Sequence, residues 1–306
     1  MTIADAAAAP PRSPLAPYVA TRVAPAEPPP ASVFRPSLAR RVGTALLGLW
    51  ALIGAALALY LWSAFDAGIM ARYGPSILEG LLVTLQLVGV SIVLGVALGL
   101  VVAAGRLSSN MPVQTVSYAY VYFFRGTPLL AQIFLVYYGA GEFRPALEAV
   151  GLWGFFRDAF NCALFTFTLN TAAYQGEIYR GAIAAVSRGQ WEAALSLGLP
   201  GRVTFVKIVA PQAMITALRP LGNEIVFMIK GSAVASIVTV LDLMGETRLA
   251  FSRTFDFQVY LWAAILYFIL VEALRRVWDV IEARLVRHLQ PVTSGPPAVV
   301  VDSEPH

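Results

Sequence analysis

Two long stretches without a charged side chain constrain this sequence more than any other feature. Residues 43–65 and residues 80–105 contain no Asp, Glu, Lys or Arg over 23 and 26 positions. A helix needs about 20 apolar residues to cross the hydrocarbon core of a membrane. A backbone that faces lipid must satisfy its hydrogen bonds internally, and the alternating pattern of a membrane β-barrel is absent from the sequence. The two stretches therefore predict membrane-spanning helices.

Four further hydrophobic segments carry only a few charges each. The six predicted spans are Gly43–Phe65, Gly80–Gly105, Met111–Gly141, Phe160–Val186, Met214–Leu241 and Phe257–Val271, the last extending to about Trp278. In the fifth, three charges and Pro220 predict a broken or half-buried helix that faces protein rather than lipid. Charged residues make up 13% of the chain, about half of the usual ~25%. The sequence thus predicts an all-α, multi-pass membrane protein.

The distribution of Arg and Lys predicts the orientation of these spans. With a cytoplasmic N-terminus, the inner connections hold 13 of these cations, the outer connections hold five, and four lie within spans. Positive charge accumulates on the cytoplasmic side, so both termini are predicted to be cytoplasmic. Ala and Pro account for 19 of the first 36 residues, and residues 1–42 are predicted to form a disordered tail. Residues 287–306 form a predicted C-terminal tail.

Composition also excludes several functions. The net charge of +4 comes from 20 Arg and two Lys spread singly along the chain, which does not form the basic stripe of a nucleic-acid-binding protein. A single cysteine excludes an internal disulfide and a CxxC zinc site. A membrane-bound enzyme would need a cluster of His, Cys or carboxylates at the membrane edge, and the only clustered candidates lie within residues 187–212. We therefore expect no catalytic residue, no cofactor and no metal.

The connection Ser187–Gln212, on the predicted cytoplasmic side, contains two short amphipathic pieces. Gln190–Leu197 favours a helix that Gly198 and Pro200 end. Val203–Val209 favours a second one, which we expect to end at Pro211. Such pieces either dock into a groove of a partner protein or lie in the lipid interface, and their amphipathicity alone leaves both interpretations open.

The spacing within this connection resembles a known motif. Glu192-Ala193-Ala194 is followed by three residues and Gly198, then by nine residues and Ile208, one residue, Ala210 and Pro211. This is similar to the EAA-x3-G-x9-I-x-L-P loop of ABC-importer permeases, with Ala210 where Leu is usual. The resemblance implies that Glu192, Ala193, Ala194, Gly198, Ile208 and Pro211 form the coupling segment that docks into an ATPase subunit. In it, Glu192 supplies a polar anchor, the two alanines allow close approach and Gly198 lets the chain turn.

The chain has no phosphate-binding loop of its own. A Walker A loop needs Gly-Lys followed by Ser or Thr. Lys207 follows Val206, and Lys230 precedes Gly231, so neither lysine fits. ATP hydrolysis is therefore expected to occur in a separate subunit.

Three further stretches are similar to polar amino acid permeases, in particular those for histidine, lysine, arginine and ornithine and those for opines. They are YFFRGTPLL at residues 122–130, TLNTAAYQGEI at residues 168–178 and PLGNEI at residues 220–225. The resemblance covers roughly residues 76–290, and it departs at residues 230–234, where Lys-Gly-Ser-Ala-Val stands for the usual Lys-Asp-[Ser/Thr]-Ser-Leu. It implies a five-helix type I importer core over residues 76–286, preceded by one extra span at 43–65.

The same resemblance implies the setting and the partners of the chain. It predicts a multi-pass protein of a bacterial inner membrane that moves a polar, basic amino acid or an opine. The implied partners are an ABC ATPase subunit, a periplasmic substrate-binding protein and a second permease subunit, either identical or a sister chain, besides membrane lipid. An ion-coupled secondary amino acid carrier remains the alternative, since buried carboxylates occur in that class as well.

Polar residues inside spans are candidates for the substrate pathway, because a buried charge in a membrane is costly. The candidates are Arg125, Gly126, Thr127, Pro128, Asn170, Tyr174, Glu177, Asn223, Glu224 and Lys230. We expect Arg125–Thr127 to face a substrate carboxylate, because Gly126 and Pro128 open the backbone there, and Glu177 or Glu224 to face a cation. Two alternatives stay open. Arg125 could pair internally with one of these glutamates, and the polar side chains could serve only to hold the helices together.

Overall fold

The computed structural model describes residues 38–63 and 65–286, and the regular elements within these ranges are all helices. The chain divides into two compact units at Tyr60 and Leu61, and we describe them separately. The first contains most of helix α1 (Leu38–Ser63), none of whose residues is buried. The helix begins at Leu38, five residues earlier than the predicted span. The rest of the predicted N-terminal tail and the predicted C-terminal tail lie outside the described residues.

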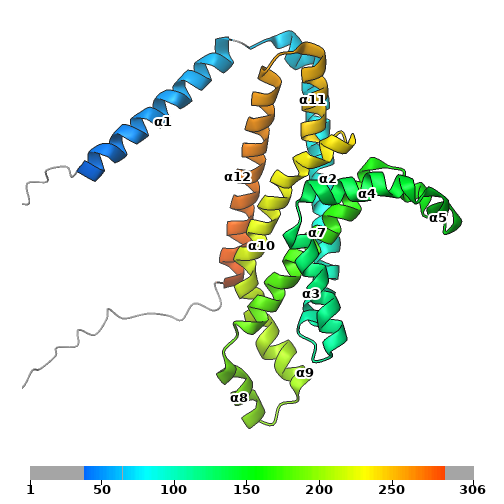
Figure 1. Ribbon diagram of the computed structural model, residues 1–306. Coiled ribbons are helices and arrows are strands. Elements are labelled where there is room, and N and C mark those ends of the chain that lie inside the picture. Colours follow the sequence, from blue (N-terminus) through cyan, green and yellow to red (C-terminus); the bar gives the residue numbers. More distant parts are fainter. Residues whose placement is uncertain (1–37, 64, 287–306) are drawn as a thin grey trace, which may run out of the picture. The chain divides into compact units, whose positions relative to one another are not determined.

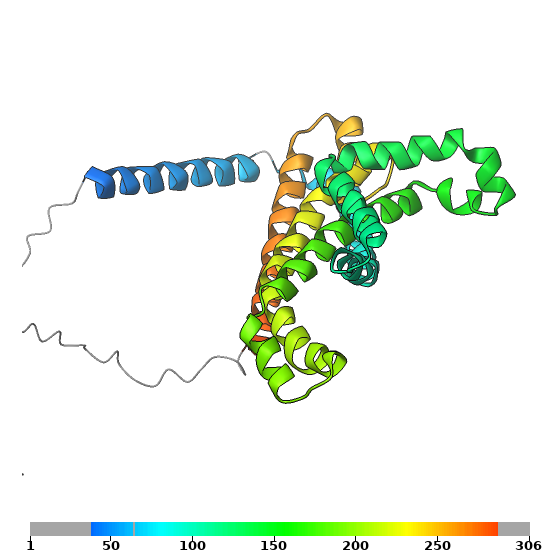
Figure 2. The ribbon, with the colours of Figure 1, turned by 60° about the horizontal axis from the view of Figure 1, so that its bottom comes forward.

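The second unit is a helical bundle. Helices α2 (Ala67–Arg106), α7 (Ala159–Ala184), α10 (Ala210–Ser232) and α12 (Gln258–Val286) run side by side (Figure 1). Four shorter helices follow α2 and precede α7 in the sequence. They are α3 (Met111–Gly126), α4 (Leu129–Glu142), α5 (Arg144–Ala149) and α6 (Trp153–Phe156). Helices α8 (Arg188–Ser196) and α9 (Gly201–Thr204) lie at one end of this bundle, and α11 (Leu243–Thr254) lies at the other (Figures 1 and 2). The π turn η1 (Phe205–Val209) precedes α10, and the 3-10 helix η2 (Ala233–Val238) follows it.

Helix α7 is the centre of this bundle, in contact with α2, α3, α4 and α10. Small residues allow α2 and α7 to approach closely. A methyl group on Gly99 would stand 3.0 Å from the Gln175 Cβ, and one on Gly176 would stand 2.7 Å from a Val102 methyl. Without a hydrophobic driving force between helices in lipid, such close backbone packing is what holds membrane helices together. The α2–α7 pair therefore fixes the frame in which the polar residues of α7 are held.

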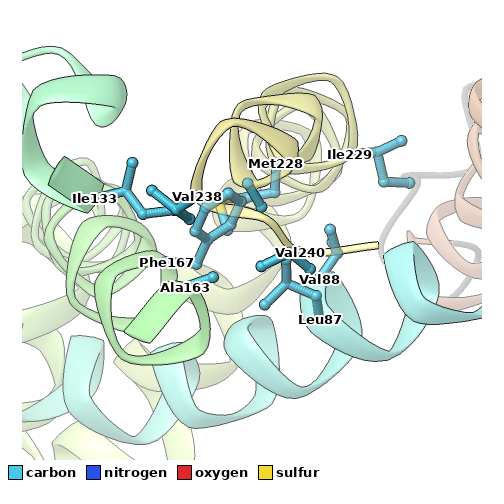
Figure 3. Packing of buried hydrophobic residues seen from close by; sticks show 10 residues of the cluster. Leu87, Val88, Ile133, Ala163, Phe167, Met228, Ile229, Val238 and Val240 are labelled. Carbon is cyan, nitrogen blue, oxygen red and sulfur yellow. The ribbon is translucent and has the colours of Figure 1, made fainter. Parts of the chain in front are cut away.

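The largest apolar cluster joins α2, α4, α7, α10 and η2. Figure 3 shows Phe167 of α7 at its middle, with Leu87, Ile133, Met228 and Val238 around it. Phe167, Leu87, Ile133 and Val238 are fully buried. This cluster anchors α4 and the end of α10 to the central helices.

Within residues 38–63 and 65–286, four helical stretches are long and apolar enough to cross a membrane, or five if the bent pair α3–α4 is one span. They are α1, α2, residues 201–238 and α12. The predicted fourth span, now α7, is not among them. It carries Asn170, Gln175, Glu177 and Arg180, and neighbouring helices rather than lipid cover much of its surface. The all-α architecture with several apolar spans agrees with the prediction, and the count of six stays a prediction.

The two prolines of this region differ in outcome. The sequence left a broken and a half-buried helix open for the fifth span, and the structure shows the second, because α10 runs through Pro220 without a break and is partly buried. The expectation that the second amphipathic piece ends at Pro211 was wrong, because this piece continues into α10. Pro211 comes directly after the π turn η1, and this wider turn accommodates a residue that has no N–H to donate along the helix. The π turn η1 leads into it, and the N–H of Ala210 donates to the Phe205 carbonyl.

Candidate functional site

The predicted coupling segment forms a helical hairpin at one end of the bundle. Ser187 caps α8 by accepting a hydrogen bond from the Gly189 N–H at 3.3 Å. The helix ends in a turn in which the Gly198 N–H donates to the Leu195 carbonyl at 2.9 Å and the Leu199 N–H donates to the Ala194 carbonyl at 3.1 Å. Gly198 has a φ of +69°, a left-handed conformation that costs other residues about 1–2 kcal/mol. This geometry accounts for the glycine at position 198.

The alanines of the motif play different parts in this hairpin. Ala194 is 1% exposed and packs inside the hairpin, whereas Glu192 and Ala193 are exposed. The apolar side chains of Leu195 and Leu197 are 66% and 77% exposed. Ile208 is half-buried in η1, next to Pro211 at the start of α10. The hairpin thus presents a carboxylate and apolar side chains together at the end of the bundle.

A second site lies where α3 and α4 meet. Their axes differ by 105°, and the break falls at Thr127 and Pro128, next to Gly126, as the sequence predicted. A break of this kind frees backbone carbonyls, which must find other partners inside a membrane protein. The Gln132 Nε2 donates to the carbonyls of Phe124 and Thr127, at 2.9 and 3.1 Å, and to the Thr127 hydroxyl at 2.8 Å. This amide therefore holds the break in its bent form.

Asn170 of α7 completes this network. Its Nδ2 donates to the Phe124 carbonyl at 3.2 Å and to the Gln132 Oε1 at 2.9 Å. Asn170 thus forms interhelical hydrogen bonds and also lines a cavity, so both interpretations of this residue stay open. Sequence reasoning missed Gln132. Its signal was a lone amide within the otherwise apolar segment LLAQIFLVYY.

Three adjoining cavities of about 580, 400 and 530 Å³ meet at Tyr174, which lines all three. Nine of the ten candidate pathway residues line them: Arg125, Gly126, Thr127, Pro128, Asn170, Tyr174, Glu177, Asn223 and Glu224. Lys230 is exposed and is not among their described lining residues. The structure thus brings together stretches of α3, α7 and α10 that lie about 100 positions apart in the sequence.

Arg125 lies over the ring of Tyr174, with its guanidinium carbon 5.1 Å from the ring centroid. A cation over an aromatic face is attracted by the ring's electrons. Among the described residues, no ion pair joins Arg125 to Glu177 or Glu224, so the internal pairing that the sequence left open is not what the structure shows. The Arg125 guanidinium is thus held at the cavity without a carboxylate partner from these two residues.

The two candidate glutamates differ in their surroundings. Glu177 binds Arg106 at 2.8 Å and Arg180 at 2.9 Å, so both of its oxygens already have cationic partners. Glu224 is only 7% exposed, and its Oε1 accepts a hydrogen bond from the Thr171 hydroxyl at 3.0 Å. Buried carboxylates without a paired cation are rare in proteins. Of the two, Glu224 is therefore the one with capacity for a further cation.

Sequence reasoning missed both Arg106 and Thr171. Arg106 ends α2, and it also lies over the Tyr118 ring, 4.8 Å from its centroid. It looked like an ordinary cation in a connection, because nothing in its local sequence reveals a partner 71 positions away. Thr171 lies among small polar residues of α7 and showed no distinguishing pattern.

Comparisons with known proteins agree with this arrangement. Residues 95–288 match the family described as binding-protein-dependent transport system inner membrane component. The chain is 38% identical over 231 residues to the nopaline transport system permease protein NocM of Agrobacterium fabrum, covering 75% of this chain and 96% of that protein. It is 33% identical over 227 residues to the L-cystine transport system permease protein TcyL of Bacillus subtilis, covering 74% and 93%.

Solved structures show the same likeness. A crystal structure of an amino acid ABC transporter with histidines is 33% identical, covers 72% of this chain and 99% of that one, and superposes with a TM-score of 0.65. The MetNI methionine ABC transporter in an inward-facing conformation is 16% identical, with a TM-score of 0.55, which shows a shared fold alone.

Proposed function

Because this chain belongs to the binding-protein-dependent family of inner membrane transport components, as a permease subunit of an ATP-binding-cassette importer, we propose that it forms half of a pathway for a polar amino acid or an opine. The adjoining cavities around Tyr174 support the proposal, because Arg125 lines two of them and Glu224 lines the third. An amino acid has a carboxylate and an ammonium at a fixed spacing. A cation and an anion in adjoining cavities match both groups.

The carboxylate of the substrate is assigned to the α3–α4 break. The first N–H groups of α4 have no partner within the helix, and such groups favour an anion. Arg125 adds a full positive charge close by. The substrate ammonium, or the cationic end of an opine or a basic side chain, is assigned to Glu224. Glu177 then serves to join α7 to α2 through Arg106, with Arg180 of α7 on its other oxygen, rather than to contact substrate.

The rest of the importer follows from the same assignment. The hairpin of α8 and α9 docks into an ATPase subunit on the cytoplasmic side, and α11 lies on the side where a periplasmic binding protein delivers substrate. The six spans, with both termini cytoplasmic, fit this arrangement. A second permease subunit, identical or a sister chain, closes the other half of the pathway. The family match gives no support to an ion-coupled carrier, since binding-protein-dependent importers are driven by ATP.

Uptake by a Glu224→Gln variant tests the assignment. Glutamine keeps the size and the Thr171 contact but removes the charge, and a charge-assisted hydrogen bond contributes about 1.5–3 kcal/mol. We expect the KM for uptake of a basic amino acid or opine to rise by about 10- to 100-fold. Radiolabelled uptake in a strain lacking the chromosomal copy, with a panel of amino acids and opines, measures it.

The matched control is Glu148→Gln in α5, whose carboxylate forms an exposed pair with Arg144 at 2.8 Å. Exposed pairs contribute little to stability, and this one lies outside the cavity, so uptake should be unchanged. Undiminished uptake by the Glu224 variant removes that residue from the substrate site. An absence of ATP-dependent uptake for every compound of the panel would contradict the substrate class.

A further inference from the structure

A groove between α10 and α12 adjoins the central cavities at Asn223, which lines both, and its other lining residues belong to neither site described above. It has a volume of about 360 Å³, and its polar lining residues are Arg219, Asn223, Arg275, Asp279 and Glu282. Trp278 forms part of its wall, with its Nε1 donating to the Leu218 carbonyl at 2.9 Å. Its ring lies so close to Gly222 that a methyl group there would collide with it. The aromatic wall of the groove is therefore fixed in place, by a hydrogen bond and by close packing against Gly222.

Charge is divided unevenly along this groove. Arg275 lines one end of the groove, and it shares Glu272 with Arg276, at 3.0 and 2.8 Å. Glu272 and Arg276 lie beside the lining, and the three residues together carry one positive charge in excess. One to two helical turns further, Arg219 pairs with Glu282 at 2.7 Å while Asp279 lies near the same arginine. Among the described residues no ion pair involves Asp279, so a negative charge is in excess there. The groove thus has a positive end and a negative end.

The surroundings of the groove indicate where its ligand comes from. Phe268, Ile269, Val277 and Val280 of α12 are between 50% and 72% exposed, and they form apolar surface along the same helix. Five charged residues between Glu272 and Glu282 are too many for the hydrocarbon core, and together with Trp278 they place this part of α12 at the membrane interface. A molecule in the groove would lie where lipid headgroups lie, beside a surface that acyl chains cover.

We propose that this groove binds the zwitterionic headgroup of phosphatidylethanolamine. Its phosphate meets the Arg275 guanidinium, and its primary ammonium donates hydrogen bonds to Asp279 and Glu282. Phosphatidylcholine carries the same charges but has no N–H donor, and phosphatidylglycerol has no cation for the acidic end. The charge pattern and the hydrogen-bond acceptors together therefore select the ethanolamine headgroup. This assignment is independent of the substrate that the chain transports.

Lipid retention by the purified full-length chain tests the proposal. The protein is incubated in detergent with phosphatidylethanolamine, phosphatidylcholine or phosphatidylglycerol of identical acyl chains, and bound lipid is counted by native mass spectrometry. One charge-assisted hydrogen bond corresponds to about a tenfold preference. We expect that preference for phosphatidylethanolamine over each of the other two lipids. Equal retention of phosphatidylethanolamine and phosphatidylcholine, or of phosphatidylethanolamine and phosphatidylglycerol, overturns the proposal.

Asp279→Asn locates the binding in the groove. Asp279 is exposed, so its replacement leaves the packing intact, and the preference over phosphatidylcholine should disappear. Glu148→Gln, which removes an exposed carboxylate from α5, should leave the preference unchanged. A preference that survives in the Asp279 variant contradicts the proposed site. Displacement of the lipid by free arginine would assign the groove to the transported solute instead, and would equally overturn the proposal.

Discussion

Glu192 is the charged residue of the hairpin that is best placed to meet another protein. It is exposed on α8, while its neighbour Ala194 is buried in the hairpin. We expect Glu192→Lys to reduce co-purification of the ATPase subunit by about tenfold or more, because a hydrogen bond from the partner to a carboxylate contributes about 1.5–3 kcal/mol and the lysine reverses its charge. Pull-down through a tag on this chain measures it.

The control for that measurement is Glu148→Lys, which makes the same charge reversal on α5 and should leave ATPase binding intact. Unchanged binding of the Glu192 variant would favour the other interpretation of α8, in which it lies in the lipid interface with Leu195 and Leu197 inserted.

Asp242 makes the stability of the chain depend on pH. It follows η2 outside the apolar spans, is fully buried and caps α11 by accepting the Gly245 N–H at 2.9 Å. Burial raises the pKa of this carboxyl from 3.8 to about 6. Between about pH 4 and pH 6 the folded chain keeps a proton that the unfolded chain releases. The free energy of unfolding therefore falls as pH rises through this window, by at most about 3 kcal/mol.

Asp242→Asn should abolish this dependence, because asparagine still caps a helix but does not ionise. The Tm of the wild type relative to this variant is expected to decrease between pH 4 and pH 7 in detergent. Asp256→Asn serves as the control, since Asp256 also accepts a backbone N–H, that of Gln258 at 2.8 Å, from a less buried position. A Tm difference between the wild type and the Asp242 variant that stays constant from pH 4 to pH 7 would contradict the prediction.

At the residue scale, the sequence could identify the charged side chains of the site but not the residues with which they pair. Arg125 and Glu224 stood out because charges in spans are costly, and both line the central cavities. The division of roles between Glu177 and Glu224 was beyond reach, because it depends on Arg106, which comes from another helix. Thr171 was equally invisible, since a hydroxyl in a helix shows its importance only once its acceptor is placed beside it.

At the scale of elements, the amides of Gln132 and Asn170 hold the bend between α3 and α4. The Phe124 carbonyl accepts from both, whereas Gln132 is the donor given above for the Thr127 carbonyl, and a buried carbonyl without a partner costs about 1–3 kcal/mol. Gln132→Leu should therefore lower the Tm by several degrees and reduce uptake, since the start of α4 lines the cavity.

Gln114→Leu is the matched control for this change, because Gln114 is an exposed amide of α3. Thermal melting of purified protein and uptake in cells measure the two effects. A Gln132 variant that melts and transports like the Gln114 variant would show that the bend is held by packing alone.

The positions of the helices were largely predictable from the sequence. Whether a helix continues through or breaks at a proline was not. Uncharged stretches located α1 and α2, and Gly126 with Pro128 located the break. The proline at 211 was misleading, because a π turn before it lets the helix continue, and for Pro220 the sequence left both a broken and an unbroken helix open. Backbone irregularities of this kind are settled by neighbours from distant parts of the sequence, which a local pattern does not contain.

At the scale of the whole molecule, the proposed topology places α8 and α11 on opposite sides of the membrane. Single cysteines at Ser196 and Ser252, in a Cys162→Ala background, test it, because both serines are exposed and Cys162 is buried. In intact spheroplasts a membrane-impermeant maleimide should label the cysteine at 252 and leave the one at 196 unmodified until the membrane is opened. Labelling of position 196 from outside would contradict the coupling role of the hairpin.

The central position of α7 was likewise not predictable from the sequence. Its polarity keeps it out of the helices that are apolar enough to span a membrane, yet this same polarity supplies the cavity around Tyr174. The assembly of helices around a polar centre follows from close contacts such as Gly99 with Gln175, which involve residues about 80 positions apart.

The continuity of residues 201–238 has a mechanical consequence. These residues form one helical rod of 38 residues, about 55 Å long at 1.5 Å per residue. Its lower end is the hairpin, its middle carries Glu224 and its upper end enters the apolar cluster around Phe167. Since the upper end is clamped, a sideways displacement of the hairpin swings the middle of the rod by a smaller amount in the same direction. The wall that bears Glu224 would then move as the short arm of a lever.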